Sequence, residues 1–332
     1  MSDSGGAVYV AWSTKTGRVL ELSELVGARP FLLYPRLLSG RRLTPLRYLV
    51  SAVWTFSWLL WRRPSVVMVI NPPVPAAVCV ALYGRVSGAR VVLDSHPGGF
   101  GAQSDRLSAT LQPLHRWAVR RAVATLVTGE PWATAVRRWG GVPLVVHEAP
   151  AAWTAAPRPV TTAPTEAERG PRVLFLGTFG RDEPVDAVFE AARAMPDVCL
   201  RVTGDPEAAP AALLAGRPDN ILLLGFLPPE QYQHEVLEAD VVVVLTTEPT
   251  SVMRAAYEAV YAQRPLVVSD WPGLREVFPH AVHVANTAEG VAAGVRQAVE
   301  QRAALAARAP EARAAQAARW DAQVAALRGV VG

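Results

Sequence analysis

The sequence predicts an α/β protein of two open parallel sheets, each covered by helices, that face one cleft. Short apolar runs alternate with helical patterns from residue 7 onward, which is typical of a sheet with helical crossovers. The alternation stops at residues 151–170, a Pro-, Thr- and Ala-rich segment of linker composition, and then restarts. Because 332 residues suffice for two cores, we expect domains at 1–150 and 171–309 and a C-terminal helix at 310–332.

The first domain is predicted from apolar runs and the periodic segments between them. Its expected strands are residues 7–13, 30–34, 65–70, 90–93, 125–128 and 142–146. Its expected helices are residues 21–27, 48–61, 76–86 and 108–121, with a short helix before residue 142. This alternation predicts parallel strands, whose carboxyl ends share the edge of the sheet where ligands bind.

The second domain repeats the pattern after the linker. Its expected strands are residues 173–176, 199–202, 221–224, 241–245 and 266–269. Its expected helices are residues 185–195, 229–238 and 251–262. From Thr287 onward the alanine-rich sequence predicts a helix that breaks at Pro310, resumes to Leu327 and packs back on the first domain.

Composition and charge exclude other classes of protein. Half of the residues (51%) are apolar and 19% are charged, which excludes a disordered chain. The arginines behind the net charge of +4 are spread over both halves, so we expect no nucleic-acid partner. Cys79 and Cys199 lie in different predicted domains and are expected to be buried thiols in a reducing cytoplasm. The polar N-terminus, MSDSGG, lacks the blocks of a signal peptide.

Residues 44–63 carry a possible membrane contact. The apolar run from 48 to 61 contains Trp54, Trp58 and Trp61 and has arginines on both sides. It is shorter than the roughly 20 apolar residues of a spanning helix, so an interfacial helix is one interpretation. A helix buried in the first domain is the other.

A strand, loop and helix in the second domain suit an anion. The strand ends at Leu245, and the next helix is expected to start near Ser251 with Thr250 or Ser251 as its cap. The amides of Thr250, Ser251 and Val252 would then bind a diphosphate, assisted by the helix dipole. Glu258 lies two turns further on and could accept hydrogen bonds from ribose hydroxyls. An ordinary helix with a solvated glutamate is the alternative.

This segment resembles the donor motif of the family-4 glycosyltransferases, in which two glutamates bracket seven residues. Glu258 matches the second glutamate, and the sequence Arg264–Asp270 (RPLVVSD) matches the strand that follows. Four other segments of the second domain resemble the family in the expected order: Phe175-Leu176-Gly177, Gly204-Asp205, 220–227 and Ala239-Asp240. The resemblance implies a GT-B fold of two Rossmann-like domains and a nucleotide-sugar donor.

The chain departs from that family at three positions. Thr250 stands where the first glutamate is expected, Thr178 replaces the arginine after Gly177, and Glu183 replaces the lysine five residues later. The cations available for the donor are therefore Arg181 and Arg254.

A second resemblance is to the eukaryotic chitobiosyldiphosphodolichol β-mannosyltransferases. It is carried by segments in both domains: 71–75 (NPPVP), 91–96 (VVLDSH), 178–183 (TFGRDE) and Met253-Arg254. This resemblance implies inversion at the sugar and a polyprenyl-diphosphate-linked acceptor.

His96 and Asp94 are the candidate catalytic pair. His96 follows a strand where the resembling families have a histidine near the transferred sugar; it could bond a sugar hydroxyl, while Asp94 orients it or acts as base. Alternatively, His96 caps the backbone at residues 98–99. His147 and Glu148 are weaker candidates, and three further histidines are expected at the surface or in packing: His115, His234 and His280. The sequence has no Cys/His spacing typical of a zinc site, no Asp-x-Asp motif and no dinucleotide-binding glycine motif. We therefore expect no metal and no cofactor.

These observations together predict transfer of a hexosyl group from a nucleoside-diphosphate sugar to a glycan or polyprenyl-linked acceptor. The leaving diphosphate would be stabilised by the amides of 250–252 and by Arg181 or Arg254. Two alternatives stay open: a catalytically silent GT-B subunit that binds a partner or a membrane, and a sugar-nucleotide epimerase.

Overall fold

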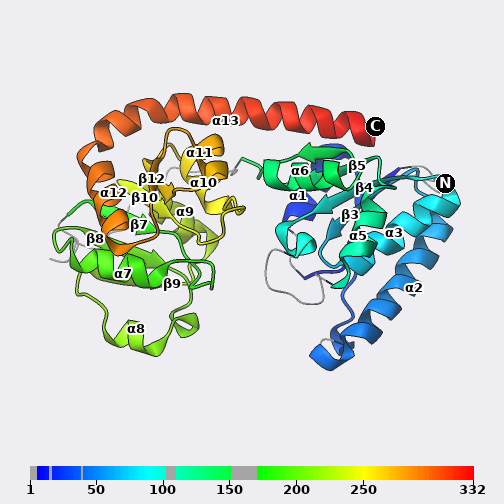
Figure 1. Ribbon diagram of the computed structural model, residues 1–332, viewed down its shortest axis with the longest axis horizontal. Helices are drawn as coiled ribbons and strands as arrows, with labels where there is room; N and C mark the ends of the chain where they lie inside the picture. The colour runs from blue at the N-terminus through cyan, green and yellow to red at the C-terminus, as the bar shows by residue number, and fades with distance from the viewer. Residues whose placement is uncertain (1–5, 15–16, 39, 102–109, 151–169) are drawn as a thin grey trace. The chain divides into compact units, whose positions relative to one another are not determined.

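The computed structural model describes residues 6–14, 17–38, 40–101, 110–150 and 170–332. These form two compact units: unit 1 contains residues up to 149 together with 319–332, and unit 2 contains 150–318. In each unit the described residues build one six-stranded parallel sheet with helices packed against it (Figure 1). The predicted α/β class is confirmed.

Unit 1 has the strand order β2-β1-β3-β4-β5-β6. The strands are β1 (Ala7–Ala11), β2 (Arg29–Leu32), β3 (Val66–Asn71), β4 (Arg90–Ser95), β5 (Ala124–Val127) and β6 (Pro143–Val145). The helices are α1 (Gly17–Val26), α2 (Thr44–Arg62), α3 (Val74–Ser87), α5 (Gln112–Val119) and α6 (Glu130–Arg138). The chain runs from β1 to β2 on one side and then to β3 on the other, so the strand order reverses between β1 and β3.

Both faces of the first sheet are buried. Alternate residues of β3 point into two separate cores, Val67 and Val69 into one and Val66 and Met68 into the other. The second core also receives one face of the C-terminal helix, through Trp320, Val324, Leu327 and Val331. Unit 1 therefore includes the last residues of the chain.

Unit 2 has the strand order β12-β11-β10-β7-β8-β9. The strands are β7 (Arg172–Phe175), β8 (Cys199–Thr203), β9 (Ile221–Gly225), β10 (Val241–Val244), β11 (Leu266–Ser269) and β12 (Val282–Val284). The helices are α7 (Val185–Arg193), α8 (Ala211–Ala215), α9 (Pro229–Glu238), α10 (Arg254–Tyr261), α11 (Pro272–Val277), α12 (Ala288–Glu300) and α13 (Arg302–Val331). After β9 the chain returns to the other side of β7, so the reversal lies between β7 and β10.

The predicted helix break at Pro310 is wrong. Helix α13 runs without interruption from Arg302 to Val331, and the break falls at Gln301, between α12 and α13. Pro310 removes one backbone hydrogen bond, but it lies on the exposed side among alanines, which have the highest helix propensity. The change from unit 2 to unit 1 falls between residues 318 and 319 rather than at 310.

Cys79 and Cys199 are both buried and free, which confirms that part of the prediction. The predicted linker lies almost wholly outside the described residues, as does the predicted helical start at residue 108.

Candidate functional sites

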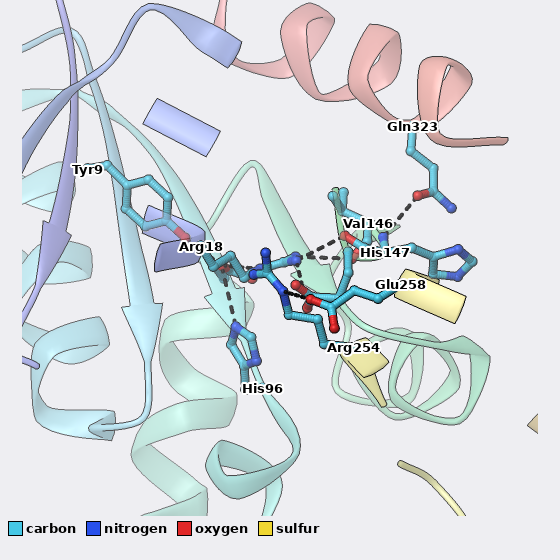
Figure 2. A network of polar contacts seen from close by, with 10 residues as sticks. Tyr9, Arg18, His96, Val146, His147, Arg254, Glu258 and Gln323 are labelled. Atoms are coloured by element: carbon cyan, nitrogen blue, oxygen red, sulfur yellow. Dashed lines mark hydrogen bonds and ion pairs between the residues drawn. The ribbon is translucent and has the colours of Figure 1, made fainter. Parts of the chain in front are cut away.

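A buried polar cluster lies at the carboxyl edge of the first sheet, beside the strand reversal. Asp94, the fifth residue of β4, is fully buried. Its Oδ2 accepts a hydrogen bond from the hydroxyl of Tyr9 and another from Nε of Arg18 at 3.0 Å. Figure 2 shows Tyr9, Arg18 and His96 converging on this point. Tyr9 reaches this point from the middle of β1 and Arg18 from the start of α1, so the sheet and its first helix form the cluster together.

The charges in this cluster compensate one another. Burial alone would raise the pKa of Asp94, but Arg18, His96 and the hydrogen bonds hold it well below its usual range. Burial would lower the pKa of Arg18, but Asp94 and Glu148 raise it above its ordinary value. Burial and the neighbouring Asp94 charge raise the pKa of Tyr9. The cluster is therefore a buried carboxylate–guanidinium pair with a neutral phenol.

Arg18 also binds the segment that follows β6. Its Nη1 and Nη2 donate to the carbonyls of His147 and Val146, each at 3.0 Å, and Nη1 lies 3.4 Å from Oε1 of Glu148. One side chain on α1 thus connects β4 with residues 146–148. Arg18 was not predicted as a site residue, because an arginine in an amphipathic helix carries no local sign of a partner 76 residues away.

His96 is placed beside Asp94 as predicted, directly after β4. Its Nε2 is buried and lies 3.6 Å from Oδ2 of Asp94, longer than a hydrogen bond, while the side chain as a whole is 27% exposed. The alternative that the His96 side chain caps the backbone at 98–99 is wrong, because only its carbonyl bonds the Gly99 amide. The contact favours the tautomer with a proton on Nε2, facing the carboxylate.

His115 is a further buried polar residue at this edge. Its Nδ1 lies 2.9 Å from the carbonyl of Gly99, which can only accept, so Nδ1 carries the proton. Its Nε2 then accepts from Nδ2 of Asn71 at 2.9 Å and from Oγ of Ser95 at 3.0 Å. Burial lowers the pKa of His115 to about 4. The expectation of packing is confirmed, but the hydrogen-bond network that fixes the loop at Gly99 was not foreseen.

His147 and Glu148 lie next to the cluster. The His147 amide donates to Oε1 of Gln323 on α13 at 2.9 Å, and its side chain is buried. Burial, with Arg319 and Arg18 nearby, lowers the pKa of His147 to about 4. Glu148 faces Arg18, and its side chain is 16% exposed.

In unit 2 the loop after β7 surrounds a carboxylate. Both oxygens of Glu183 accept from the Thr178 amide, at 3.0 and 2.9 Å, and one also accepts from the Gly180 amide at 3.3 Å. The Thr178 hydroxyl donates to the same group at 2.9 Å. Gly177 donates its amide to Oγ1 of Thr203, and Arg181 is exposed.

A glycine at the end of β8 permits this loop to pack. Gly204 has φ +109°, and a Cβ there would lie 2.8 Å from the carbonyl oxygen of Gly177. On the other side, the Thr247 amide donates to the carbonyl of Asp182 at 2.7 Å, which joins the loops after β7 and β10. Both loops flank the strand reversal, the usual ligand position in such sheets.

The predicted cap of α10 is wrong. The helix begins at Arg254, its N-cap is Met253, and no side chain caps it. The Ser251 amide instead donates to the carbonyl of Glu248 at 3.1 Å, so it is engaged within a turn. Val252 and Met253 pack against the core, which keeps the chain extended and delays the helix. Thr250 lies in the same turn, half-buried.

Glu258 is held by two partners on the helices below this loop. Its Oε1 accepts from Nε of Arg254 at 3.1 Å, four residues earlier on α10 (Figure 2). Its Oε2 accepts from the hydroxyl of Tyr232 on α9 at 2.5 Å. Burial and the neighbouring Glu258 charge raise the pKa of Tyr232. The carboxylate is 14% exposed, and each of its oxygens can accept a further bond.

Residues 161–318 match the family Glycosyl transferases group 1. This segment is therefore similar in sequence to the group 1 glycosyltransferases. It contains the Glu183 loop, the turn before α10 and the Arg254–Glu258 pair. No curated protein matches the chain.

Solved structures resemble the whole chain. Sucrose-phosphate synthase from Thermosynechococcus elongatus has a TM-score of 0.72 at 14% identity, with 97% of both chains covered. Anabaena Alr3699/HepE, solved in complex with UDP, has a TM-score of 0.69 at 15% identity, covering 98% of this chain and 97% of that one. A glycosyltransferase from Rickettsia africae has a TM-score of 0.69 at 12% identity, covering 99% and 98%. These likenesses show the fold, and the predicted GT-B architecture is confirmed.

Proposed function

We propose that this chain is an active glycosyltransferase that moves a hexosyl group from a nucleoside-diphosphate sugar. The observation that carries the proposal is Glu258 of the segment that matches group 1, held by Arg254 and Tyr232 at the position of the family's second glutamate. Two oriented oxygens with spare acceptor capacity suit the hydroxyls of a ribose. HepE of Anabaena was solved with UDP and with UDP-glucose, so uridine-diphosphate sugars are the first donors to test.

The proposed mechanism assigns a task to each unit. Arg254 and Arg181 offset the charge that develops on the leaving diphosphate, in place of a bound metal. On unit 1, His96 hydrogen-bonds a sugar hydroxyl or takes the acceptor proton, and the neighbouring Asp94 carboxylate orients its ring. The buried partner Arg18 keeps Asp94 ionised.

The test is release of nucleoside diphosphate from a panel of nucleotide sugars. We expect release in the presence of EDTA, and Glu258→Ala should weaken donor binding by about 1.5–3 kcal/mol, the value of a hydrogen bond to a charged group. Glu230→Ala, which removes an exposed glutamate on α9, is the matched control and should leave donor binding unchanged. Equal donor affinity in folded Glu258→Ala would contradict the donor assignment.

The silent-subunit alternative is favoured by the three departures from the donor motif: Thr250 at the first glutamate, Thr178 at the arginine and Glu183 at the lysine. A chain that binds nucleotide sugars but releases no nucleoside diphosphate with any acceptor tested would support that alternative. Release that is lost in His96→Ala, in a protein that still binds donor, would support the enzyme.

We further propose that the acceptor is a glycan or a polyprenyl-linked lipid and that the reaction takes place at the inner face of the cell membrane, in synthesis of cell-surface polysaccharide or glycolipid. Helix α2 supports this location, because one side of it exposes large apolar side chains. Its buried side carries Ser51, Thr55 and Leu59, with Thr55 accepting from the Trp12 indole at 2.9 Å. Its other side exposes Leu49, Val53, Trp54, Leu60 and Trp61, while Phe56 and Trp58 pack against the core of unit 1.

The outward face of α2 is an apolar surface with cationic ends. Trp54 is 59% exposed and Trp61 is 72% exposed, and they lie seven residues apart on one side of the helix. An open groove of about 630 Å³ runs along this side, lined by Leu49, Val50, Val53, Trp54, Ser57 and Trp58. The guanidinium of Arg62 stacks 4.8 Å from the centre of the Trp61 ring. An interfacial helix needs at least two of the three tryptophans exposed on one side beside Arg62 or Arg63, and the exposure of Trp54 and Trp61 supports that interpretation of 44–63.

The charge around α2 favours an anionic lipid surface as the partner. Between Glu24 and Asp94 the sequence has nine arginines and no acidic residue. A second copy of the chain would bring cationic helix ends together in either orientation, whereas anionic lipid attracts each arginine by about 1 kcal/mol. Among the described residues, no helix is long and apolar enough to cross a membrane.

Vesicle sedimentation tests the lipid contact. Binding to vesicles containing phosphatidylglycerol should exceed binding to phosphatidylcholine alone and should fall with added salt. The pair Trp54→Ser and Trp61→Ser should reduce it, whereas Phe226→Ser, which removes an 86% exposed aromatic residue from unit 2, should not. Equal sedimentation with both lipids, or none, would refute the docking surface.

A further inference from the structure

The loop after β7 is a ring of donors closed around the chain's own glutamate. Two amides and one hydroxyl, from Thr178 and Gly180, converge on the Glu183 carboxylate within 3.3 Å. Phe179 between them has φ +57°, in the left-handed region, which turns the neighbouring amides toward one point. Successive amides in such a conformation form a nest that binds anions.

The nest lies where a donor is expected to bind. It follows β7, and the strand order reverses between β7 and its neighbour β10, whose loop leads into Arg254 and Glu258. The bond from the Thr247 amide to the Asp182 carbonyl links the two loops. The nest, Arg254 and Glu258 therefore belong to adjoining loops of one ligand-binding edge.

We propose that this nest receives a phosphate of the donor and that Glu183 is its internal competitor. The inference rests on the proposed function. The Glu183 carboxylate satisfies the amides while the site is empty, and the diphosphate takes its place when the donor binds. Glu183 is close to the chain surface, so its side chain can leave into water while its backbone stays anchored before α7. The donor class is one with a diphosphate, because a neutral sugar has no charge to exchange for the carboxylate.

If Glu183 competes with the donor phosphate, its removal should raise the affinity of the site for anions. Removal of a purely structural residue would not. Removing Glu183 frees the donors of the nest and removes a negative charge beside the incoming phosphate. We expect Glu183→Gln and Glu183→Ala to bind inorganic pyrophosphate and UDP more tightly by on the order of tenfold, the scale of a unit charge a few ångströms away in a partly solvated site. A glutamate that served only to shape the loop would give weaker binding when removed.

The experiment is calorimetric titration of the full chain with pyrophosphate and with UDP. Asp186→Asn is the matched control, since it removes the same charge from the exposed first turn of α7 without touching the nest. Tighter binding in both Glu183 variants, with wild-type affinity in the control, supports the role of Glu183 as a competitor. Unchanged or weaker binding in the folded variants, or an equal gain in Asp186→Asn, overturns it.

A measurement on the unaltered protein removes any dependence on how the variants fold. Saturation with UDP should shift the amide NMR signals of Thr178 and Gly180, because their acceptor changes from carboxylate to phosphate. Signals that stay in place at saturation overturn the inference while leaving the proposed function intact. Absence of any UDP or pyrophosphate binding, in wild type and variants alike, overturns both.

Discussion

Replacing Arg18 by methionine isolates the energetics of the buried cluster in unit 1. Methionine keeps most of the side-chain length but removes the guanidinium, which leaves Asp94 buried without its cation. Loss of one partner of a buried ion pair costs about 3–5 kcal/mol. The carbonyls of Val146 and His147 also lose a donor, so the upper part of that range is expected.

The destabilisation caused by Arg18→Met should depend on pH, and its direction follows from the pKa of Asp94. In the wild type the folded pKa of Asp94 lies below its unfolded value of about 3.9, so its stabilisation is present above that pH and is lost as acid protonates the folded carboxylate. In Arg18→Met, burial dominates and raises the folded pKa. The variant should therefore be most destabilised at neutral pH, and the difference from wild type should shrink toward pH 4.

Denaturant unfolding followed by tryptophan fluorescence measures this effect, because eight of the ten tryptophans belong to unit 1: Trp12, Trp54, Trp58, Trp61, Trp117, Trp132, Trp139 and Trp320. Arg29→Met, at an exposed position of β2, is the control and should stay within about 0.5 kcal/mol of wild type. Asp94→Asn combined with Arg18→Met should recover part of the loss. A loss below about 1 kcal/mol at pH 7, or one that does not change with pH, would refute the reasoning.

Two further predictions concern single residues. Gly204→Ala should lower the free energy of unfolding by about 1–3 kcal/mol, because of its positive φ and the Gly177 carbonyl; Gly273→Ala, where an added methyl meets nothing, should be near neutral in the same denaturation assay. His115 has a folded pKa of about 4, below the unfolded value of about 6.5, so the unfolded state binds more protons and stability falls as pH drops between these values. His115→Asn should flatten that fall, and an unaltered slope would count against a neutral buried His115.

The sequence predicts the sheets well because their strands are buried on both faces. Runs such as residues 66–70 of β3 and Val241–Val244 are continuously apolar, which is typical of a strand buried on both faces. Helix ends depend on tertiary contacts that such patterns do not show. Helix α10 starts at Arg254 instead of Ser251 because Val252 and Met253 pack against the core of unit 2.

Candidate residues at strand ends were predictable for a similar reason, and their partners were not. Asp94 and His96 stand out because a polar pair follows an apolar strand. Tyr9 and Arg18 complete the cluster from residues 85 and 76 positions away, and local sequence does not show which distant side chains share an edge. The hydrogen bonds of His115 to Asn71 and Ser95 were hidden in the same way.

The departure at Glu183 can be explained by its hydrogen-bond partners as well as by its charge. The family that the donor motif resembles has a lysine at the position of Glu183. The loss of that cation would favour an inactive chain. In the structure the same carboxylate satisfies the amides of Thr178 and Gly180, so the anion-binding shape of the loop is kept. A position that had only lost its function would have no reason to retain a group that fits the nest. Reversing the charge while keeping the donors therefore favours a phosphate site whose occupancy depends on displacing Glu183, and it makes donor affinity, rather than catalysis, the property that this position controls.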